Sequence, residues 1–297
     1  MKSFPHCPVM TEEVLYWLNP KPGGLYVDCT LGAGGHSRSI LEKTNGQVKI
    51  LGIDWDEEAL RIAKEKLNDY KHQIVLIREN FKNLPQILKE EKIEKVDGIL
   101  YDLGVSSMQL DAPKRGFSFR YTAPLDMRMD TGQKLTAAHL VNQLSKKELE
   151  NIFLNLGEER WARRVAEFII QERKNHPLET TRDLVETIRK AIPAKVRQKR
   201  KIHFATKIFQ ALRIKVNAEL ENLKSGLEAS FNLLQRGGRI CVISYHSLED
   251  RIVKEEFKRR KGKEICILTK KVIKPSFQEI KTNPRARSAK LRAAERI

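Results

Sequence analysis

The chain has 297 residues, of which 40% are hydrophobic and 32% charged. That composition supports one large domain, or one domain with an insertion, and excludes a wholly disordered chain. No apolar run approaches the roughly 18–20 residues that a membrane span needs. The N-terminus lacks the apolar stretch of a signal peptide. The four cysteines are far apart and form no CxxC pair. This disfavours a disulfide framework or zinc ribbon and predicts a cytoplasmic protein.

The positive charge is unevenly distributed along the chain. There are 56 Lys and Arg against 38 Asp and Glu, which gives a net charge of +18. Residues 1–112 carry 14 basic and 17 acidic groups, 113–250 carry 26 and 16, and 251–297 carry 16 and 5. A nearly neutral first third joined to two strongly basic parts indicates a polyanionic partner, and nucleic acid fits better than an anionic membrane surface.

The first hundred residues alternate between short apolar strands and helices. Apolar residues recur at helical spacing over 56–70, behind an acidic first turn. Such alternation with short connections predicts a parallel sheet with helices on both faces. The strands are predicted at 25–30, 48–53, 74–78 and 96–101, and the helices at 56–70 and 83–91.

The alternation stops near residue 135, and 135–207 shows only helical periodicity, with Ser145 in an N-cap position. The strand pattern then resumes, which predicts a doubly wound α/β domain (1–112 and 208–297) interrupted by a helical insertion (113–207). The late elements are a helix at 220–234, a turn at 236–238, a strand at 239–244, a helix at 247–260 and extended stretches at 264–273 and 287–296.

A glycine-rich turn follows the first strand and contains Gly34 and Gly35. Glycine lets the backbone pass close to a ligand. Asp54 follows 20 residues after Gly34, at the tip of the next strand, where a carboxylate accepts ribose hydroxyl protons. Asp28 adds an anion nearby, which suits the cationic S-adenosylmethionine better than the pyrophosphate of NAD. A purely structural turn is the remaining alternative.

Two further positions are candidates for the same pocket. Phe81 follows the third strand, where an aromatic ring either lies against adenine or packs in the core. Asp102 ends the fourth strand, and the carboxyl ends of parallel strands face the ligand crevice. Asp102 and the Leu103 carbonyl could hold the two protons of an exocyclic amine, which frees its lone pair to attack a methyl group. The alternative for Asp102 is a loop cap.

Seven motifs together resemble the bacterial ribosomal RNA small subunit methyltransferase H family. The resemblance begins at His6-Cys7-Pro8-Val9 and runs to the last residue. The motifs are DCTLGAGGHS from Asp28, DLGVSSMQLD from Asp102, RGFSF from Arg115, PLDMRMD from Pro124, FQALRI from Phe209, HSLEDRI from His246 and NPRARSAKLRAAER from Asn283.

This resemblance implies a class I (Rossmann-like) methyltransferase fold with an all-helical insertion as the RNA-recognition domain. It implies S-adenosylmethionine-dependent N4-methylation of a cytosine in 16S ribosomal RNA, at the decoding centre of the small subunit. The cofactor residues that it implies are Gly34, Gly35, His36, Asp54, Phe81, Asp102 and Gln109, of which Gln109 rests on the resemblance alone.

The motif after the fourth strand is Asp-Leu-Gly-Val, where other amino-methyltransferases carry Asp/Asn-Pro-Pro-aromatic. The ring that stacks on the target base must therefore come from elsewhere, and Phe117, Phe119, Tyr121 and Tyr245 are candidates. His246 lies beside the predicted pocket and either orients the base or Asp102, or belongs to a structural helix cap in the neighbouring Ser247 region. His6 and Cys7 have no further ligands at useful spacing, so we expect no metal.

Residues 189–201 carry seven basic groups and no acid, which favours a phosphate-contact strip over plain solvated surface. The predicted partner is 16S ribosomal RNA or the small subunit, with no membrane, and a homodimer is left open. Three other functions remain: a DNA amino-methyltransferase, a non-catalytic RNA-binding factor, and an NAD-dependent oxidoreductase.

Overall fold

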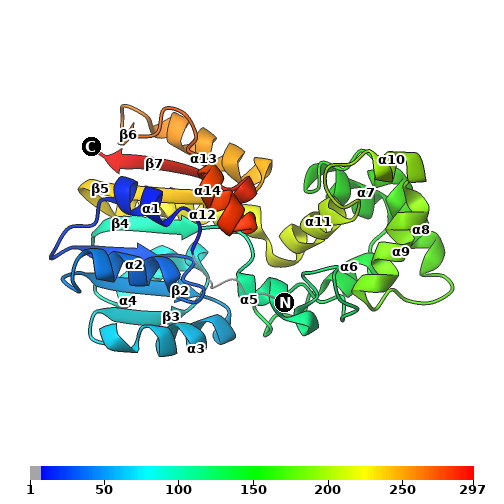
Figure 1. The fold of residues 1–297 in the computed structure, drawn as a ribbon, viewed down its shortest axis with the longest axis horizontal. Coiled ribbons are helices and arrows are strands. Elements are labelled where there is room, and N and C mark those ends of the chain that lie inside the picture. Colours follow the sequence, from blue (N-terminus) through cyan, green and yellow to red (C-terminus); the bar gives the residue numbers. More distant parts are fainter. Residues whose placement is uncertain (1–7) are drawn as a thin grey trace. The chain divides into compact units, whose positions relative to one another are not determined.

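The computed structural model describes residues 8–297, which fold into two compact units (Figure 1). The first unit comprises the chain up to Gly104 together with Leu220–Ile297, and the second is Val105–Glu219. The sequence predicts junctions at 112/113 and 207/208, and the second unit of the structure is longer at both ends. His6 and Cys7 lie outside the described residues.

A seven-stranded sheet forms the first unit, in the order β3-β2-β1-β4-β5-β7-β6 (Figure 1). Strand β7 is antiparallel to β5 and β6, and the other neighbours pair in parallel. This confirms the predicted mostly parallel sheet. The strands are β1 (Leu25–Asp28), β2 (Lys49–Asp54), β3 (Ile74–Arg78), β4 (Val96–Asp102), β5 (Leu234–Ser244), β6 (Ile265–Ile267) and β7 (Lys290–Arg296).

Strand β5 differs from its prediction. It begins at Leu234, five residues before the predicted start, because Leu234 already pairs with Val96. The next pair along the ladder is Gly98 with Arg239, so residues 235–238 loop out of the register. Gly237 has φ +79°, which suits the turn expected at 236–238. The extended stretch expected at 264–273 is also shorter, since only β6 forms a strand there.

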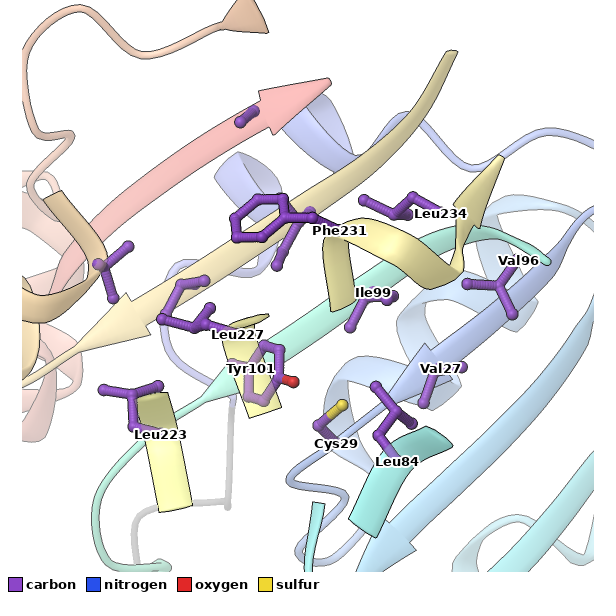
Figure 2. Packing of buried hydrophobic residues seen from close by; sticks show 14 of the residues in the cluster. Val27, Cys29, Leu84, Val96, Ile99, Tyr101, Leu223, Leu227, Phe231 and Leu234 are labelled. Carbon is purple, nitrogen blue, oxygen red and sulfur yellow. The ribbon is translucent and has the colours of Figure 1, made fainter. Parts of the chain in front are cut away.

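Helices cover both faces of the sheet because neighbouring strand residues point to opposite sides. Val27 and Ile99 belong to one buried cluster and Tyr26 and Leu100 to the other. In the first cluster, side chains of α12 pack over Ile99 and Tyr101 (Figure 2). This cluster also includes α4 and α13, and the second includes α1, α2 and α3. The helices of this unit are α1 (Thr11–Leu18), α2 (Gly35–Lys43), α3 (Glu57–Lys66), α4 (Leu84–Glu90), α12 (Glu219–Leu233), α13 (Ser247–Arg260) and α14 (Phe277–Thr282).

The second unit is helical. Ser145 caps α7 as predicted, since its Oγ accepts from the Glu148 backbone N and Glu148 Oε2 accepts from the Ser145 N. Helix α11 packs on α6 and α7, which is why this unit extends past residue 207. The helices are α5 (Ser107–Asp111), α6 (Ala137–Gln143), α7 (Lys146–Asn155), α8 (Ala162–Glu172), α9 (Thr181–Ala191), α10 (Ala194–Gln198) and α11 (Thr206–Asn217).

One buried ion pair joins distant parts of this second unit. Glu159 is 1% exposed and binds Arg200 through two hydrogen bonds of 2.7 and 2.8 Å. Burial alone would raise the pKa of Glu159, but the guanidinium of Arg200 holds it below its usual value. The pair therefore fixes the backbone that follows α10.

Across residues 8–297, none of the helices combines the length and apolar character needed to cross a membrane.

Candidate functional site

The glycine-rich turn lies between β1 and α2. Gly32 and Gly34 have φ of +52° and +79°, a backbone region that favours glycine. A Cβ on Gly34 would also lie 2.6 Å from Leu67 Cδ1. Gly34 is the N-cap residue of α2, so Gly35 opens the helix. The turn thus has the strand-to-helix geometry that the sequence predicted, and Gly34 is needed for close packing against Leu67.

Asp54 ends β2 and holds this turn in place. Its Oδ2 accepts a hydrogen bond from the Gly32 backbone N at 2.8 Å, and its Oδ1 accepts from the Asp56 N at 2.9 Å. Burial raises the pKa of Asp54 to about 6, although both hydrogen bonds oppose the shift. Each oxygen still has acceptor capacity, because a carboxylate oxygen takes more than one hydrogen bond.

Asp28 supports the turn from β1. It is 2% exposed, and its Oδ2 accepts from the Ser37 hydroxyl at 2.8 Å while its Oδ1 accepts from the Thr30 N at 3.2 Å. Burial raises the pKa of Asp28, and Asp102 contributes in the same direction, whereas His36 opposes the shift. The carboxyl group expected near the pocket is therefore present, and it interacts electrostatically with Asp102.

The Asp102 carboxylate lies between two side chains from distant parts of the chain. The Tyr245 hydroxyl donates to Oδ1 at 2.7 Å, and His36 Nε2 lies 3.4 Å from Oδ2. Burial, together with Asp102, raises the pKa of Tyr245 well above its usual value, so the phenol stays protonated and donates. The Asp102 backbone N donates to Thr30 Oγ1 at 2.6 Å, which fixes the end of β4 beside the turn.

His36 is buried in the first turn of α2. Burial by itself lowers its pKa, but Asp102, Asp28 and Glu279 together raise it above the usual value. Its Nε2 lies 3.4 Å from Asp102 Oδ2, and within residues 8–297 Nδ1 has no hydrogen-bond partner. A buried polar atom without a partner is costly, so Nδ1 is available to a polar group of a ligand.

His246 is the N-cap residue of α13. Its Nδ1 accepts from the Glu249 N at 3.4 Å, and Nε2 lies 3.1 Å from Glu249 Oε1. Glu249 Oε2 in turn accepts from the backbone N of Tyr245 at 2.8 Å and of His246 at 3.2 Å. The expected structural cap thus forms at His246 itself, and through Glu249 it fixes the residue that binds Asp102.

Phe81 begins a 3-10 turn after β3 and is packed edge to face on Tyr101, with ring centroids 5.3 Å apart. A Cβ on Gly226 of α12 would lie 2.8 Å from Phe81 Cδ2. The ring is only partly buried against the core cluster. One side of the Phe81 ring therefore packs in the core, as one of the two sequence interpretations predicted. The rest of the ring is accessible to a ligand.

Leu103 follows β4, and its N donates to the Ile243 carbonyl at 3.0 Å. Gly104 has φ +95°, and a Cβ there would lie 3.2 Å from the Tyr245 ring. Gln109 lies in the second unit, in α5, where it forms a capping box with Ser106: its N donates to Ser106 Oγ and its Oε1 accepts from the Ser106 N. Gln109 thus has a structural role in its own unit.

The chain matches the MraW methylase family over residues 3–297. Curated relatives named ribosomal RNA small subunit methyltransferase H are similar over nearly the whole chain. The relative from Finegoldia magna is 46% identical over 99% of both chains. The relative from Clostridium botulinum (strain Loch Maree) is 48% identical, over 99% of this chain and 100% of its own. The relative from Thermotoga neapolitana is 50% identical, over 98% and 96%.

The chain belongs to the MraW methylase family. This confirms the resemblance drawn from the seven motifs. For a member of this family, the sheet with its single antiparallel strand β7 is the class I methyltransferase fold that the resemblance implied.

Sequence reasoning missed several residues of this MraW family site. The Thr30 hydroxyl accepts from the Asp102 backbone N, and the Ser37 hydroxyl donates to the Asp28 carboxyl. The Glu249 carboxylate accepts from the Tyr245 backbone N. One signal was available: Glu249 follows His246 by three residues, the spacing of a capping box. No sequence pattern identified Thr30 or Ser37, because their partners are set by the packing of β1 against β4 and by the turn.

Proposed function

We propose that this chain is an S-adenosylmethionine-dependent methyltransferase that methylates N4 of a cytosine in 16S ribosomal RNA, at the decoding centre of the small subunit. The observation that carries the proposal is the Asp102 carboxylate, held at the end of β4 by Tyr245 and facing His36. The substrate class follows the full-length relatives named ribosomal RNA small subunit methyltransferase H. The base and the N4 position follow the motif resemblance.

The residues around the turn fit S-adenosylmethionine. Asp28 interacts electrostatically with both Asp54 and Asp102, and this group of carboxyls suits a cationic ligand better than a pyrophosphate. Asp54 would accept from the ribose hydroxyls, the Gly34–Gly35 backbone would lie along the ligand, and Phe81 would contact adenine. The unpartnered Nδ1 of buried His36 would bind a polar group, and Gln109 belongs to the set by resemblance. When bound, the cofactor supplies an electrophilic methyl group on sulfur.

Asp102 and the Leu103 carbonyl would accept the two protons of the exocyclic amine. Held in this way, the amine directs its lone pair at the methyl carbon. Tyr245 and His36 fix the rotamer of Asp102, so the carboxylate is oriented before the base arrives. As the new nitrogen–carbon bond forms, the amine loses one proton, which Asp102 is placed to accept. His246 would act as a positioning residue, since its cap with Glu249 fixes Tyr245.

The partner in this proposal is 16S ribosomal RNA or the assembled small subunit. The enzyme would work in the cytoplasm, as a monomer or a homodimer. Mapping methylated nucleotides of 16S RNA by mass spectrometry, from cells with and without the gene, tests the function. We expect one N4-methylcytosine to disappear without the gene. An unchanged map would refute the proposal, and transfer to duplex DNA alone would favour a DNA methyltransferase.

Asp54→Ala should weaken S-adenosylmethionine binding by about 1.5–3 kcal/mol, the effect of losing a charged hydrogen-bond acceptor. The dissociation constant measured by calorimetry should rise roughly 10- to 150-fold. Because Asp54 also holds the Gly32 N, a thermal melt must accompany the titration. Asp69→Ala, which removes one exposed carboxylate from the same unit, is the control and should bind normally. Unchanged affinity in folded Asp54→Ala would remove Asp54 from the site.

Binding of the adenosine part should depend on pH through Asp54. Its pKa is raised to about 6, and ribose hydroxyls donate to the ionised form, so affinity should fall as the pH drops through 6. The dissociation constant should be about tenfold higher at pH 5 than at pH 7, because only the ionised fraction binds. The probe is 5′-methylthioadenosine, which lacks the titrating amino acid group. Asp54→Asn should give a flat profile, and an equally flat wild-type profile would contradict the assignment.

A further inference from the structure

We propose that the helical second unit carries its own binding site for a single-stranded segment of the RNA substrate, an inference that rests on the proposed function. The site is a surface pocket of about 720 Å³. We call it the Trp161 pocket, and its lining includes Arg160, Trp161, Val196, Lys199, Lys201 and Ile202. Its volume lies in the range of small-molecule sites, which is sufficient for a nucleotide.

The cations of this pocket are available to a ligand. Arg160, Lys199 and Lys201 are exposed, and within residues 8–297 none of them forms an ion pair. The acid at the pocket, Glu159, is neutralised by its buried pair with Arg200. The pocket therefore presents uncompensated positive charge, which is what a phosphate backbone requires.

Other cations of the same unit are already paired with acids. Lys146 lies 3.6 Å from Glu167, Lys190 lies 2.9 Å from Glu172, and Arg189 lies 2.6 Å from Glu186. The strip predicted at 189–201 thus contains two kinds of basic residue. Its first two members are compensated by acids, whereas Lys199 and Lys201 are not.

The backbone that carries the free cations is fixed. Arg200 points to buried Glu159, so the side chains on either side of it, Lys199 and Lys201, are left exposed. Arg197 Nε donates to the Ile192 carbonyl at 3.0 Å, which ties α10 to the residue before its N-cap. A fixed segment loses little conformational entropy on binding, so its cations are preorganised.

An apolar surface accompanies the charge. Trp161 and Val196 line the pocket, and Ile202 is 50% exposed beside them. Phosphate contacts alone need no apolar surface, whereas single-stranded nucleic acids bind through cations and an aromatic platform for the bases. The combination favours unpaired RNA over an acidic protein segment, which would use the cations but not the indole ring.

The experiment compares two triple variants with the same loss of charge in the same unit. The pocket variant is Arg160→Gln, Lys199→Gln and Lys201→Gln, and the control is Lys146→Gln, Arg189→Gln and Lys190→Gln. Affinity for a fluorescein-labelled single-stranded RNA is measured without cofactor over a range of KCl concentrations. The pocket variant should bind at least tenfold more weakly at low salt, and its slope of log K against log salt should fall by about 2, since each phosphate contact contributes roughly 0.7. The control should keep the wild-type slope.

A third variant tests the stacking surface. Trp161→Leu keeps an apolar side chain and removes the aromatic face, so RNA affinity should fall roughly 5- to 150-fold with the salt slope unchanged. Polyglutamate serves as a second ligand. If the pocket triple weakens polyglutamate as much as RNA and Trp161→Leu affects neither, the pocket binds acidic protein and the proposal fails.

The experiment distinguishes a failure of the pocket proposal from a failure of the proposed function. Wild-type protein that methylates 16S RNA, together with a folded pocket triple that binds RNA like the control, would overturn the pocket and leave the methyltransferase intact. Wild-type protein that transfers no methyl group, while the pocket triple still loses RNA affinity, would overturn the methyltransferase and support the pocket. Thermal melts verify that all three variants are folded.

Discussion

Asp102→Asn should lower the rate of methyl transfer by roughly two to three orders of magnitude, because about 1.4 kcal/mol corresponds to a factor of ten. The substitution keeps the size of the side chain but replaces one carboxylate oxygen with an NH₂ donor. Oδ1 already accepts from Tyr245 at 2.7 Å, and Oδ2 lies 3.4 Å from His36 Nε2. The amide would face the tyrosine hydroxyl, the histidine or the substrate amine with a donor where an acceptor is needed, a mismatch of a few kcal/mol.

The measurement is single-turnover methyl transfer at saturating S-adenosylmethionine, with cofactor affinity determined separately. Cofactor binding should weaken less than the rate falls. Tyr245→Phe is the matched control: it removes one hydrogen bond to the carboxylate but leaves the carboxylate itself, so the rate should stay within about tenfold of wild type. Asp102→Asn with near wild-type rates would mean that Asp102 only supports its loop.

The sequence predicted those parts of the site that lie close together along the chain. Gly34 and Asp54 were chosen from a turn and a strand tip 20 residues apart, and in the structure Asp54 holds that turn through Gly32. The mostly parallel sheet follows from the same local alternation, whereas the order of its strands was not predicted. The bond between Tyr245 and Asp102 could not be predicted in this way, because 143 residues separate them and only the parallel pairing of β4 with β5 brings them together.

The charge pattern of the sequence likewise predicted the basic surface only in part. The sequence shows the basic run at 189–201, but it does not show which of these cations are paired with an acid. Arg200 lies in the middle of the run and is taken up by Glu159, 41 residues earlier, while its neighbours Lys199 and Lys201 are free of ion pairs within the described chain. The position of α11 shows the same limit, because its periodicity does not reveal that it packs on α6 and α7.

Arg200→Met should lower the free energy of unfolding by about 3–5 kcal/mol, the usual effect of removing one partner of a buried ion pair. Glu159 is 1% exposed and Arg200 side-chain exposure is 16%, so water cannot replace the lost guanidinium. Urea denaturation at pH 7, followed by tryptophan fluorescence, measures the loss. Lys199→Met, the same kind of change at the exposed neighbour, should stay within about 0.5 kcal/mol of wild type.

The pH dependence of that loss identifies its cause. In the wild type the pKa of Glu159 is held low by Arg200, so its contribution to stability is present above the unfolded pKa of about 4.3 and disappears as the pH falls through the folded value. In Arg200→Met, burial is opposed only by the Trp161 backbone N and by Lys207, so the pKa of Glu159 rises from its wild-type value and the variant lacks the stabilisation that the wild type gains as the pH rises. The difference between the two proteins should therefore be largest near pH 7 and shrink toward pH 4. Adding Glu159→Gln to Arg200→Met should recover part of the loss at pH 7, because it removes the unpaired charge. A loss that is independent of pH, and that Glu159→Gln does not reduce, would instead mean that Arg200 acts by packing.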